Sequence, residues 1–249
     1  MVAKSRLDDL LVRRGLAKDR KEAQALLLAG RVRAPGSPSL KAGTKVSDDV
    51  ILEREPGKAF VSRGGLKLRG ALDAFQISVA GRTCVDIGAS TGGFTDCLLK
   101  AGAVRVLAVD VGRGQLDWSL QKDPRVVNRE KTHVLRLTRS DMDLFGGDSP
   151  VFPLVTVDVS FISLETVLPH LASLLRSGTE MVCLVKPQFE ADPKDVPGGV
   201  VIDPRVCDRM VEKVSAVARE AGFDRVGLCE SPITGPEGNR EFFLHLRRR

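Results

Sequence analysis

The chain has 249 residues, a formal net charge of +6 and 43% hydrophobic residues, a composition typical of globular proteins. It contains no run of about 20 apolar residues, the length needed to cross a bilayer. Its first 15 residues carry four basic groups and lack the apolar stretch of a secretory signal. We therefore expect a cytoplasmic protein without a membrane partner.

The cysteine and histidine pattern argues against a metal site. Five cysteines are scattered without a CxxC pair, and the three histidines are far apart. We expect no metal and no disulfide framework.

The positive charge is concentrated at the N-terminus. Residues 1–58 contain 13 Lys or Arg and 8 Asp or Glu, a net of +5, which leaves +1 for the remaining 191 residues. This asymmetry favours a polyanion-binding module attached to a nearly neutral body. The alternative is a basic surface that only promotes solubility.

Two short helices are predicted in this basic module. Ser5 and Asp8 have the spacing of a capping box, and Gly15 suits the left-handed end of the helix that follows. A second helix is predicted to begin near Asp19 and to end at Gly30. Two such helices bury little apolar surface alone, so we expect them to pack on a small sheet.

The predicted sheet includes a strand at residues 50–53, which follows a turn-rich stretch at 34–44. Residues 53–60, EREPGKAF, are typical of a linker because Pro56 and Gly57 interrupt a charged segment. We therefore predict a small α+β domain at 1–58 and a second domain at 59–249.

Basic side chains are frequent along the two helices and after them. Arginine's planar fork suits phosphate groups, and no aromatic residue precedes Phe60, which favours shape and phosphate recognition of folded RNA over base stacking. Residues 5–33 closely resemble the RNA-binding domain shared by ribosomal small-subunit protein four, many pseudouridine synthases and the TlyA family. We expect an RNA partner, not DNA. The candidate contacts are Arg6, Arg13, Arg14, Arg20, Lys21, Arg31 and Arg33.

From residue 59 onward, apolar strand candidates alternate with helical stretches. This alternation predicts a mostly parallel, Rossmann-like α/β sheet covered on both faces, with its ligand beyond the carboxyl ends of the strands. The strand candidates are residues 84–87, 104–109, 151–159, 181–186 and 241–246, and the longest helix candidate is 203–221.

The glycine-rich segment VDIGASTGGFT, residues 85–95, follows the first of these strands. Its glycines let the backbone approach a ligand, which indicates a nucleotide cradle. It is not a Walker A loop, and it matches the dinucleotide pattern GxGxxG imperfectly. The candidate binding residues are Asp86, Gly88, Ser90, Gly92, Gly93 and Phe94.

A second acidic residue sharpens the choice of ligand. Asp110 ends the next strand, where a carboxylate can accept hydrogen bonds from both hydroxyls of a ribose. A ribose-bearing cofactor without a pyrophosphate fits best, and S-adenosylmethionine is such a cofactor. Asp86 is then expected near its cationic amino-acid end. Alternatively, both acids only cap the turns that follow them.

Charged residues also end two further strands. Asp158 and Lys186 each follow an apolar strand, and burying either one unpaired is costly, so we expect them to pair. Lys67, before the first strand, and Glu241, opening the last, can reach the same rim. Two ordinary salt bridges are the simpler alternative.

Several motifs, among them VSRGGLKL, VDIGASTGGFTD, DVSFISL, VKPQFE and GPEGNREFFL, resemble the TlyA family, also called haemolysin A, in order and spacing. The catalytic half of that family is similar to the FtsJ ribose methyltransferases. The resemblance covers nearly the whole chain and implies a Rossmann-like S-adenosylmethionine-dependent methyltransferase that methylates a ribose 2′-hydroxyl of ribosomal RNA. It also implies a tetrad at Lys67, Asp158, Lys186 and Glu241, with Lys186 as the base.

The chain departs from the family pattern at a few positions. Arg113 and His133 stand where relatives have an aromatic residue and an asparagine, which leaves the adenine contacts less defined. The chain ends at Arg249 without the extra helix of some relatives. The shorter form resembles family members restricted to large-subunit RNA, so we expect that substrate, free or in the ribosomal subunit, with the small subunit as the alternative.

Three other functions compete with this one. An NAD-dependent dehydrogenase is disfavoured by the imperfect glycine pattern. A membrane-lytic haemolysin needs an apolar or amphipathic insertion segment, and none is found. A catalytically silent RNA-binding assembly factor does not require all four tetrad residues.

Overall fold

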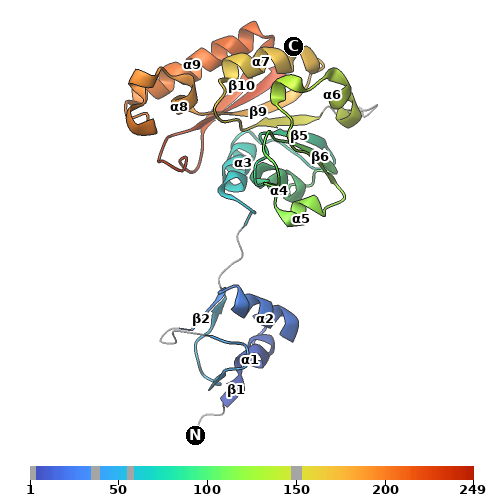
Figure 1. Ribbon diagram of the computed structural model, residues 1–249, viewed down its shortest axis with the longest axis vertical. Helices are drawn as coiled ribbons and strands as arrows, with labels where there is room; N and C mark the ends of the chain where they lie inside the picture. Colours follow the sequence, from blue (N-terminus) through green and yellow to red (C-terminus); the bar gives the residue numbers. More distant parts are fainter. Residues whose placement is uncertain (1–3, 35–39, 55–58, 147–152) are drawn as a thin grey trace. The chain divides into compact units, whose positions relative to one another are not determined.

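The computed structural model describes residues 4–34, 40–54, 59–146 and 153–249 (Figure 1). The chain forms two compact units, Met1–Ala59 and Phe60–Arg249. Pro56 and Gly57 of the predicted linker lie outside the described residues, as does part of the predicted turn-rich stretch, residues 35–39.

The N-terminal unit packs two helices, α1 (Leu7–Arg13) and α2 (Arg20–Leu28), over short strands. β1 (Lys4–Arg6) pairs antiparallel with β3 (Lys45–Ser47), and β2 (Val32–Arg33) pairs antiparallel with β4 (Glu53–Arg54). One small core joins the helices to the strands; its buried members are Leu7, Leu11, Ala17, Ala23, Leu26, Leu27 and Val32.

The predicted ends of these helices are confirmed except at the start of α1. The Asp19 side chain accepts a hydrogen bond from the Glu22 backbone at 2.8 Å, and Gly30 follows α2 with a φ of 65°. Ser5, in contrast, lies in β1 and does not cap α1. The capping-box prediction fails because Asp8 is buried and accepts hydrogen bonds from side chains instead.

The strand predicted at 50–53 is wrong for residues 50–52, since β4 begins at Glu53. Val50 belongs to a turn, where its N–H donates to the Ser47 carbonyl at 3.1 Å. Its own carbonyl accepts a hydrogen bond from Arg14. Because of these contacts, the apolar segment of residues 50–52 does not pair as a strand.

The C-terminal unit is built on a seven-stranded mixed sheet in the order β10-β11-β9-β8-β5-β6-β7. Its five parallel strands are β5 (Thr83–Ile87), β6 (Arg105–Val109), β7 (Val126–Arg129), β8 (Leu154–Val157) and β9 (Glu180–Val185). An antiparallel hairpin completes one edge; it consists of β10 (Phe223–Glu230) and β11 (Phe242–Arg248).

Helices cover both faces of this sheet (Figure 1). One buried cluster joins the sheet to α3 (Arg63–Ala74), α4 (Gly93–Lys100) and α5 (Trp118–Gln121). The other joins it to α6 (Arg139–Gly146), α7 (Leu164–Leu174) and α9 (Pro204–Glu220). The remaining short helical turns are α8 (Pro187–Glu190), η1 (Val134–Arg136), η2 (Pro193–Asp195) and η3 (Pro197–Gly199).

The predicted α/β architecture is confirmed, and its sheet is mixed because of the edge hairpin. The strand predicted at 151–159 narrows to Leu154–Val157, and residues 151 and 152 lie outside the described part of the chain. The carboxyl ends of β5, β6, β8 and β9 meet at one rim, which places the chemistry-bearing residues near one another.

Candidate active site

The glycine-rich loop crosses from β5 to α4 at this rim. Gly88 has a φ of 85°, and a Cβ there would lie 2.2 Å from the backbone oxygen of Asp158. Only glycine suits both the left-handed backbone and this close approach. The loop after β5 therefore packs directly against the loop after β8.

A cavity of about 530 Å³ opens beside this loop, between β5, β6 and the segment after β8. Asp110 lies in its wall: one carboxylate oxygen accepts the Ser90 N–H at 2.8 Å and the other accepts the Gly112 N–H at 2.6 Å. Much of the remaining wall is apolar and includes Val109, Val111, Val134, Val159 and Ile162. A largely apolar slot with the Asp110 carboxylate in its wall suits a nucleoside, whose base is flat and whose ribose carries hydroxyl donors.

A second cavity, of about 310 Å³, adjoins the first, and both are lined by Gly88, Ser90 and Asp158. Lys67 lines it from α3. Gly93 and Phe94 line it from the start of α4. The two cavities therefore form neighbouring compartments on either side of the glycine-rich loop.

The four predicted catalytic residues form two ion pairs at this rim. Lys67 Nζ lies 2.5 Å from Glu241 Oε2, and both side chains are buried. Lys186 Nζ lies 2.6 Å from Asp158 Oδ1 and donates to Ser160 Oγ at 2.9 Å. Lys67 and Asp158 line the smaller cavity, so one member of each pair faces it, whereas Lys186 and Glu241 are in neither cavity lining. Two buried lysines are thus each held by a carboxylate at this rim.

Asp86 lies behind the loop and lines neither cavity. Its side chain is fully buried and accepts hydrogen bonds from Thr95 Oγ1 at 2.7 Å and Thr156 Oγ1 at 3.0 Å. Burial raises the pKa of this carboxyl to about 7, although the two threonines act in the opposite direction. Asp86 is thus held by the two threonines, and its expected position near the amino-acid end of a cofactor stays a prediction.

Gly92 also lies outside the two linings. It begins α4 with a φ of 93°, and a Cβ there would meet the Leu120 side chain at 2.2 Å. Its role is therefore to let the loop turn into the helix under α5.

Two groups of cavity residues were missed by sequence reasoning. Ser62 and Gly64, at the start of α3, line the smaller cavity; the SRGG stretch before Lys67 was the available signal. Phe161 lines the larger one, with 92% of its surface exposed and a φ of 63°. Its ring centroid lies 5.2 Å from that of Phe189. Nothing in a single sequence reveals an aromatic residue held outward in a left-handed conformation.

The predicted RNA-binding residues lie in the N-terminal unit. Arg13 pairs with Asp48 at 3.3 Å, and Arg14 donates to the backbone oxygens of Asp48 and Val50. Arg6 and Arg20 both contact Asp8. Lys21 and Arg33 are exposed, and Arg31 is half-buried.

Across the described residues, no group of three or more His, Cys, Asp or Glu side chains has the arrangement of a metal site. Within the same part of the chain, no helix is both long and apolar enough to cross a membrane.

A Rossmann-like sheet with a glycine cradle, an acidic residue after the second strand and paired lysines at the rim defines a class, the methyltransferases that bind a nucleoside cofactor. Residues 60–248 match the FtsJ-like methyltransferase family, and residues 5–50 match the S4 domain. The chain belongs to the FtsJ-like methyltransferases and, within them, to the group of TlyA proteins.

Two curated relatives and a solved structure match most or all of the chain. The chain is 50% identical to the 16S/23S rRNA (cytidine-2′-O)-methyltransferase TlyA of Mycobacterium tuberculosis, over 99% of this chain and 91% of the relative. It is 34% identical to the 23S rRNA (cytidine-2′-O)-methyltransferase TlyA of Campylobacter jejuni, over 75% of this chain and 70% of the relative. A solved structure of a Streptococcus thermophilus protein named as a hemolysin aligns with a TM-score of 0.72 and 40% identity, covering 100% of this chain and 90% of the other.

Proposed function

We propose that this protein transfers a methyl group from S-adenosylmethionine to the 2′-hydroxyl of a cytidine ribose in ribosomal RNA. Residues 1–58 bind the RNA and residues 59–249 carry out the transfer. The observation that carries this proposal is a cavity lined by one member of each of two lysine–carboxylate pairs, beside a nucleoside-sized cavity.

The larger cavity fits the nucleoside half of the cofactor. The role proposed for Asp110 is to accept hydrogen bonds from the ribose hydroxyls, with the valine and isoleucine side chains as apolar walls for the adenine. The backbone at Gly88 and Ser90 then borders the amino-acid part. When bound, S-adenosylmethionine supplies an electrophilic methyl group on a sulfonium sulfur.

The paired lysines supply what the acceptor needs. A ribose hydroxyl is a very weak acid, so its proton must pass to a base as the new O–C bond forms. Lys186 is the proposed base, and its Nζ receives that proton. Asp158 fixes its direction through the 2.6 Å contact, and Lys67, held by Glu241, stabilises the developing negative charge on oxygen.

The RNA substrate follows from the S4 domain and from the relatives. Both relatives described above carry 23S rRNA in their names, and one of them also carries 16S rRNA. Large-subunit RNA is therefore the favoured substrate, free or within the subunit. A ribosomal substrate places the reaction in the cytoplasm.

The test incubates full-length protein and radiolabelled S-adenosylmethionine with separated ribosomal subunits and with the RNA extracted from each. Lys186→Ala is compared with Lys194→Ala, a change at an exposed lysine of η2. Cofactor affinity is measured for each protein by calorimetry. We expect ribose label on large-subunit RNA with the parent chain and Lys194→Ala, and a loss of at least a hundredfold with Lys186→Ala.

Each other outcome has a clear meaning. Label on small-subunit RNA alone would refute the substrate preference and leave the reaction intact. Label on a base instead of a ribose would refute the 2′-hydroxyl as acceptor. Cofactor binding without label on any RNA would refute the transfer and favour a silent RNA-binding factor.

A further inference from the structure

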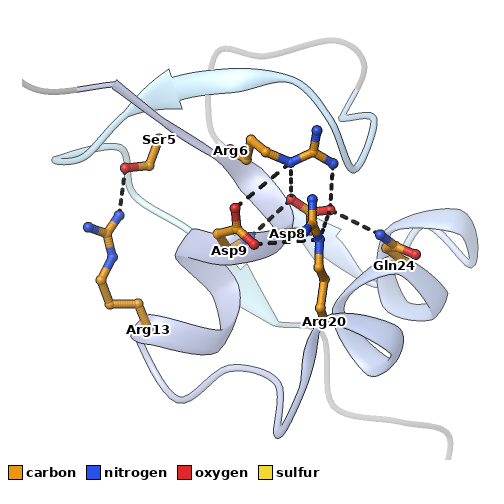
Figure 2. A network of polar contacts seen from close by, with 7 residues as sticks. All are labelled: Ser5, Arg6, Asp8, Asp9, Arg13, Arg20 and Gln24. Atoms are coloured by element: carbon orange, nitrogen blue, oxygen red, sulfur yellow. Dashed lines mark hydrogen bonds and ion pairs between the residues drawn. The ribbon is translucent and has the colours of Figure 1, made fainter.

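One acidic side chain organises the helical part of the N-terminal unit (Figure 2). Asp8, on α1, has no exposed surface. Its carboxylate accepts hydrogen bonds from Arg6 Nε and Nη2 at 3.0 and 2.9 Å, from Arg20 Nε at 3.0 Å and from Gln24 Nε2 at 3.1 Å. The hydrogen bonds from Arg6 hold the pKa of this carboxyl well below its usual range. Asp8 therefore stays charged, and it joins the start of α1 to α2.

In both Arg6 and Arg20, one edge of the guanidinium group faces Asp8 and the other faces solvent. Their side chains remain 41% and 51% exposed, although their Nε atoms point at the buried carboxylate. Figure 2 shows both guanidinium groups beside the Asp8 carboxylate, and both donate to the same oxygen, Oδ2. The remaining N–H groups of Arg6 and Arg20 are thus held near each other and accessible from outside.

The net charge of this cluster would not by itself attract a phosphate group. Asp9 lies 3.8 Å from Arg6 and 3.5 Å from Arg20, so two positive and two negative side chains form one cluster. Their formal charges cancel. If this cluster binds phosphate, the fixed directions of its N–H donors must supply the attraction, because an arginine that is already ordered loses less side-chain entropy on binding.

We propose that Asp8 is a positioning residue that holds Arg6 and Arg20 as a preformed clamp for phosphate groups of the RNA. The inference rests on the proposed RNA substrate and adds to it the pair of arginines that bind the backbone and the residue that orients them. It makes a counterintuitive prediction: removing a negative charge from this basic module weakens its affinity for a polyanion.

The experiment compares Asp8→Asn with Asp49→Asn in the full-length protein. Both changes remove one negative charge from the same module, and Asp49 is exposed. Binding of RNA extracted from large ribosomal subunits is measured between 50 and 200 mM salt, together with kcat and KM for methyl transfer. We expect Asp8→Asn to weaken binding about 5- to 30-fold and to raise KM with kcat unchanged at saturating RNA. Asp49→Asn is expected to bind as tightly as the parent chain or more tightly.

Two further variants separate positioning from folding. Arg6→Lys and Arg20→Lys keep the positive charge and lack the planar fork, so each is expected to weaken RNA binding several-fold while the circular dichroism and the melting temperature stay close to those of the parent chain. These two variants decide the question if Asp8→Asn does not fold.

The inference is overturned if Asp8→Asn, folded, binds RNA as tightly as Asp49→Asn, or if both lysine variants bind like the parent chain. A parent chain that binds no ribosomal RNA overturns the proposed substrate itself and the clamp with it. The failure of the clamp alone is recognised by tight parental binding that these substitutions leave unchanged.

Discussion

Asp86 is a carboxyl group that is fully buried at the end of β5, where burial raises its pKa from an ordinary value of 3.8 to about 7. The folded chain therefore holds a proton on Asp86 at pH values at which the unfolded chain has lost it. Unfolding between about pH 4 and pH 7 releases that proton, so the contribution of this group to the free energy of unfolding falls as pH rises through that window.

Asp86→Asn tests this linkage because asparagine has nearly the same shape and does not ionise. We expect the urea midpoint of the variant, relative to that of the parent chain, to rise between pH 5 and pH 8. The measurement is urea unfolding without cofactor at several pH values. Asp208→Asn, at an exposed position of α9, is the control and should keep the parental pH dependence. An Asp86→Asn curve parallel to that of the parent chain would disprove the assignment.

Phe161 is the most exposed large apolar side chain of the proposed site, and its ring lies at the edge of the nucleoside cavity beside that of Phe189. An outward aromatic ring at the rim of a ribose methyltransferase site suits stacking by a nucleobase of the substrate. We expect Phe161→Leu to weaken RNA binding roughly 5- to 100-fold, the range of one lost base–aromatic stack, and Phe161→Trp to retain it.

The two substitutions are compared by RNA titration and by calorimetry with the cofactor. Leucine preserves an apolar wall, so cofactor affinity should change less than RNA affinity. Equal losses in both affinities would show that Phe161 supports the cofactor cavity and not the RNA.

At the scale of whole elements, Glu190 connects the two segments that carry one lysine–carboxylate pair. Its buried carboxylate, on α8, accepts a hydrogen bond from Ser163 Oγ at 2.5 Å and from the Leu164 N–H at 2.9 Å. Burial raises its pKa. α8 follows Lys186, and α7 begins shortly after Asp158. Glu190 therefore sets the distance between the elements that hold this ion pair.

Glu190→Ala is expected to lower kcat by roughly ten- to a hundredfold and to leave the RNA dissociation constant unchanged, because a small displacement of reacting groups is costly. Glu190→Gln can accept from the Leu164 N–H through its amide oxygen and donate to Ser163 Oγ through its amide nitrogen, so it should retain most of the activity. Single-turnover rates at saturating RNA and cofactor give the comparison. Equal activity of the alanine variant and the parent chain would exclude this connecting role.

A helix or strand could be predicted from the sequence where its own residues form a clear apolar pattern. β5, β6 and β9 were predictable because buried parallel strands are continuous apolar runs. β7 was missed because Asn128 and Arg129 interrupt its short apolar start, and β10 was missed because most of its side chains are exposed and Gly227 accompanies an irregularity in pairing. The burial of Asp8 was equally hidden, since its partners lie up to 16 residues away.

The whole molecule combines two units of different charge. The basic excess of residues 1–58 and the strand-end residues of the rim were both visible in the sequence, since each depends on residue type at a known place in the fold. The pairing of Lys67 with Glu241 across 174 positions was only one of several possibilities, because it depends on the position of the edge hairpin. Because RNA binding and cofactor binding are assigned to different units, the two affinities can be compared in the full-length protein.

Salt should weaken RNA binding far more than cofactor binding. In the proposed function, arginine and lysine side chains contact RNA phosphates, whose counterions are released on association. Three such contacts predict a roughly 20- to 40-fold loss of RNA affinity between 50 and 200 mM salt. The cofactor cavity is partly enclosed and largely apolar, so cofactor affinity should change less than about twofold. Filter binding for RNA and calorimetry for the cofactor, on the same full-length protein, give the two slopes. Arg20→Ala should make RNA affinity depend less steeply on salt and leave the salt dependence of cofactor affinity unchanged. An unaltered salt dependence of RNA affinity in this variant would exclude a phosphate contact at Arg20. An RNA affinity of the parent chain that is insensitive to salt would exclude phosphate recognition by the basic unit altogether.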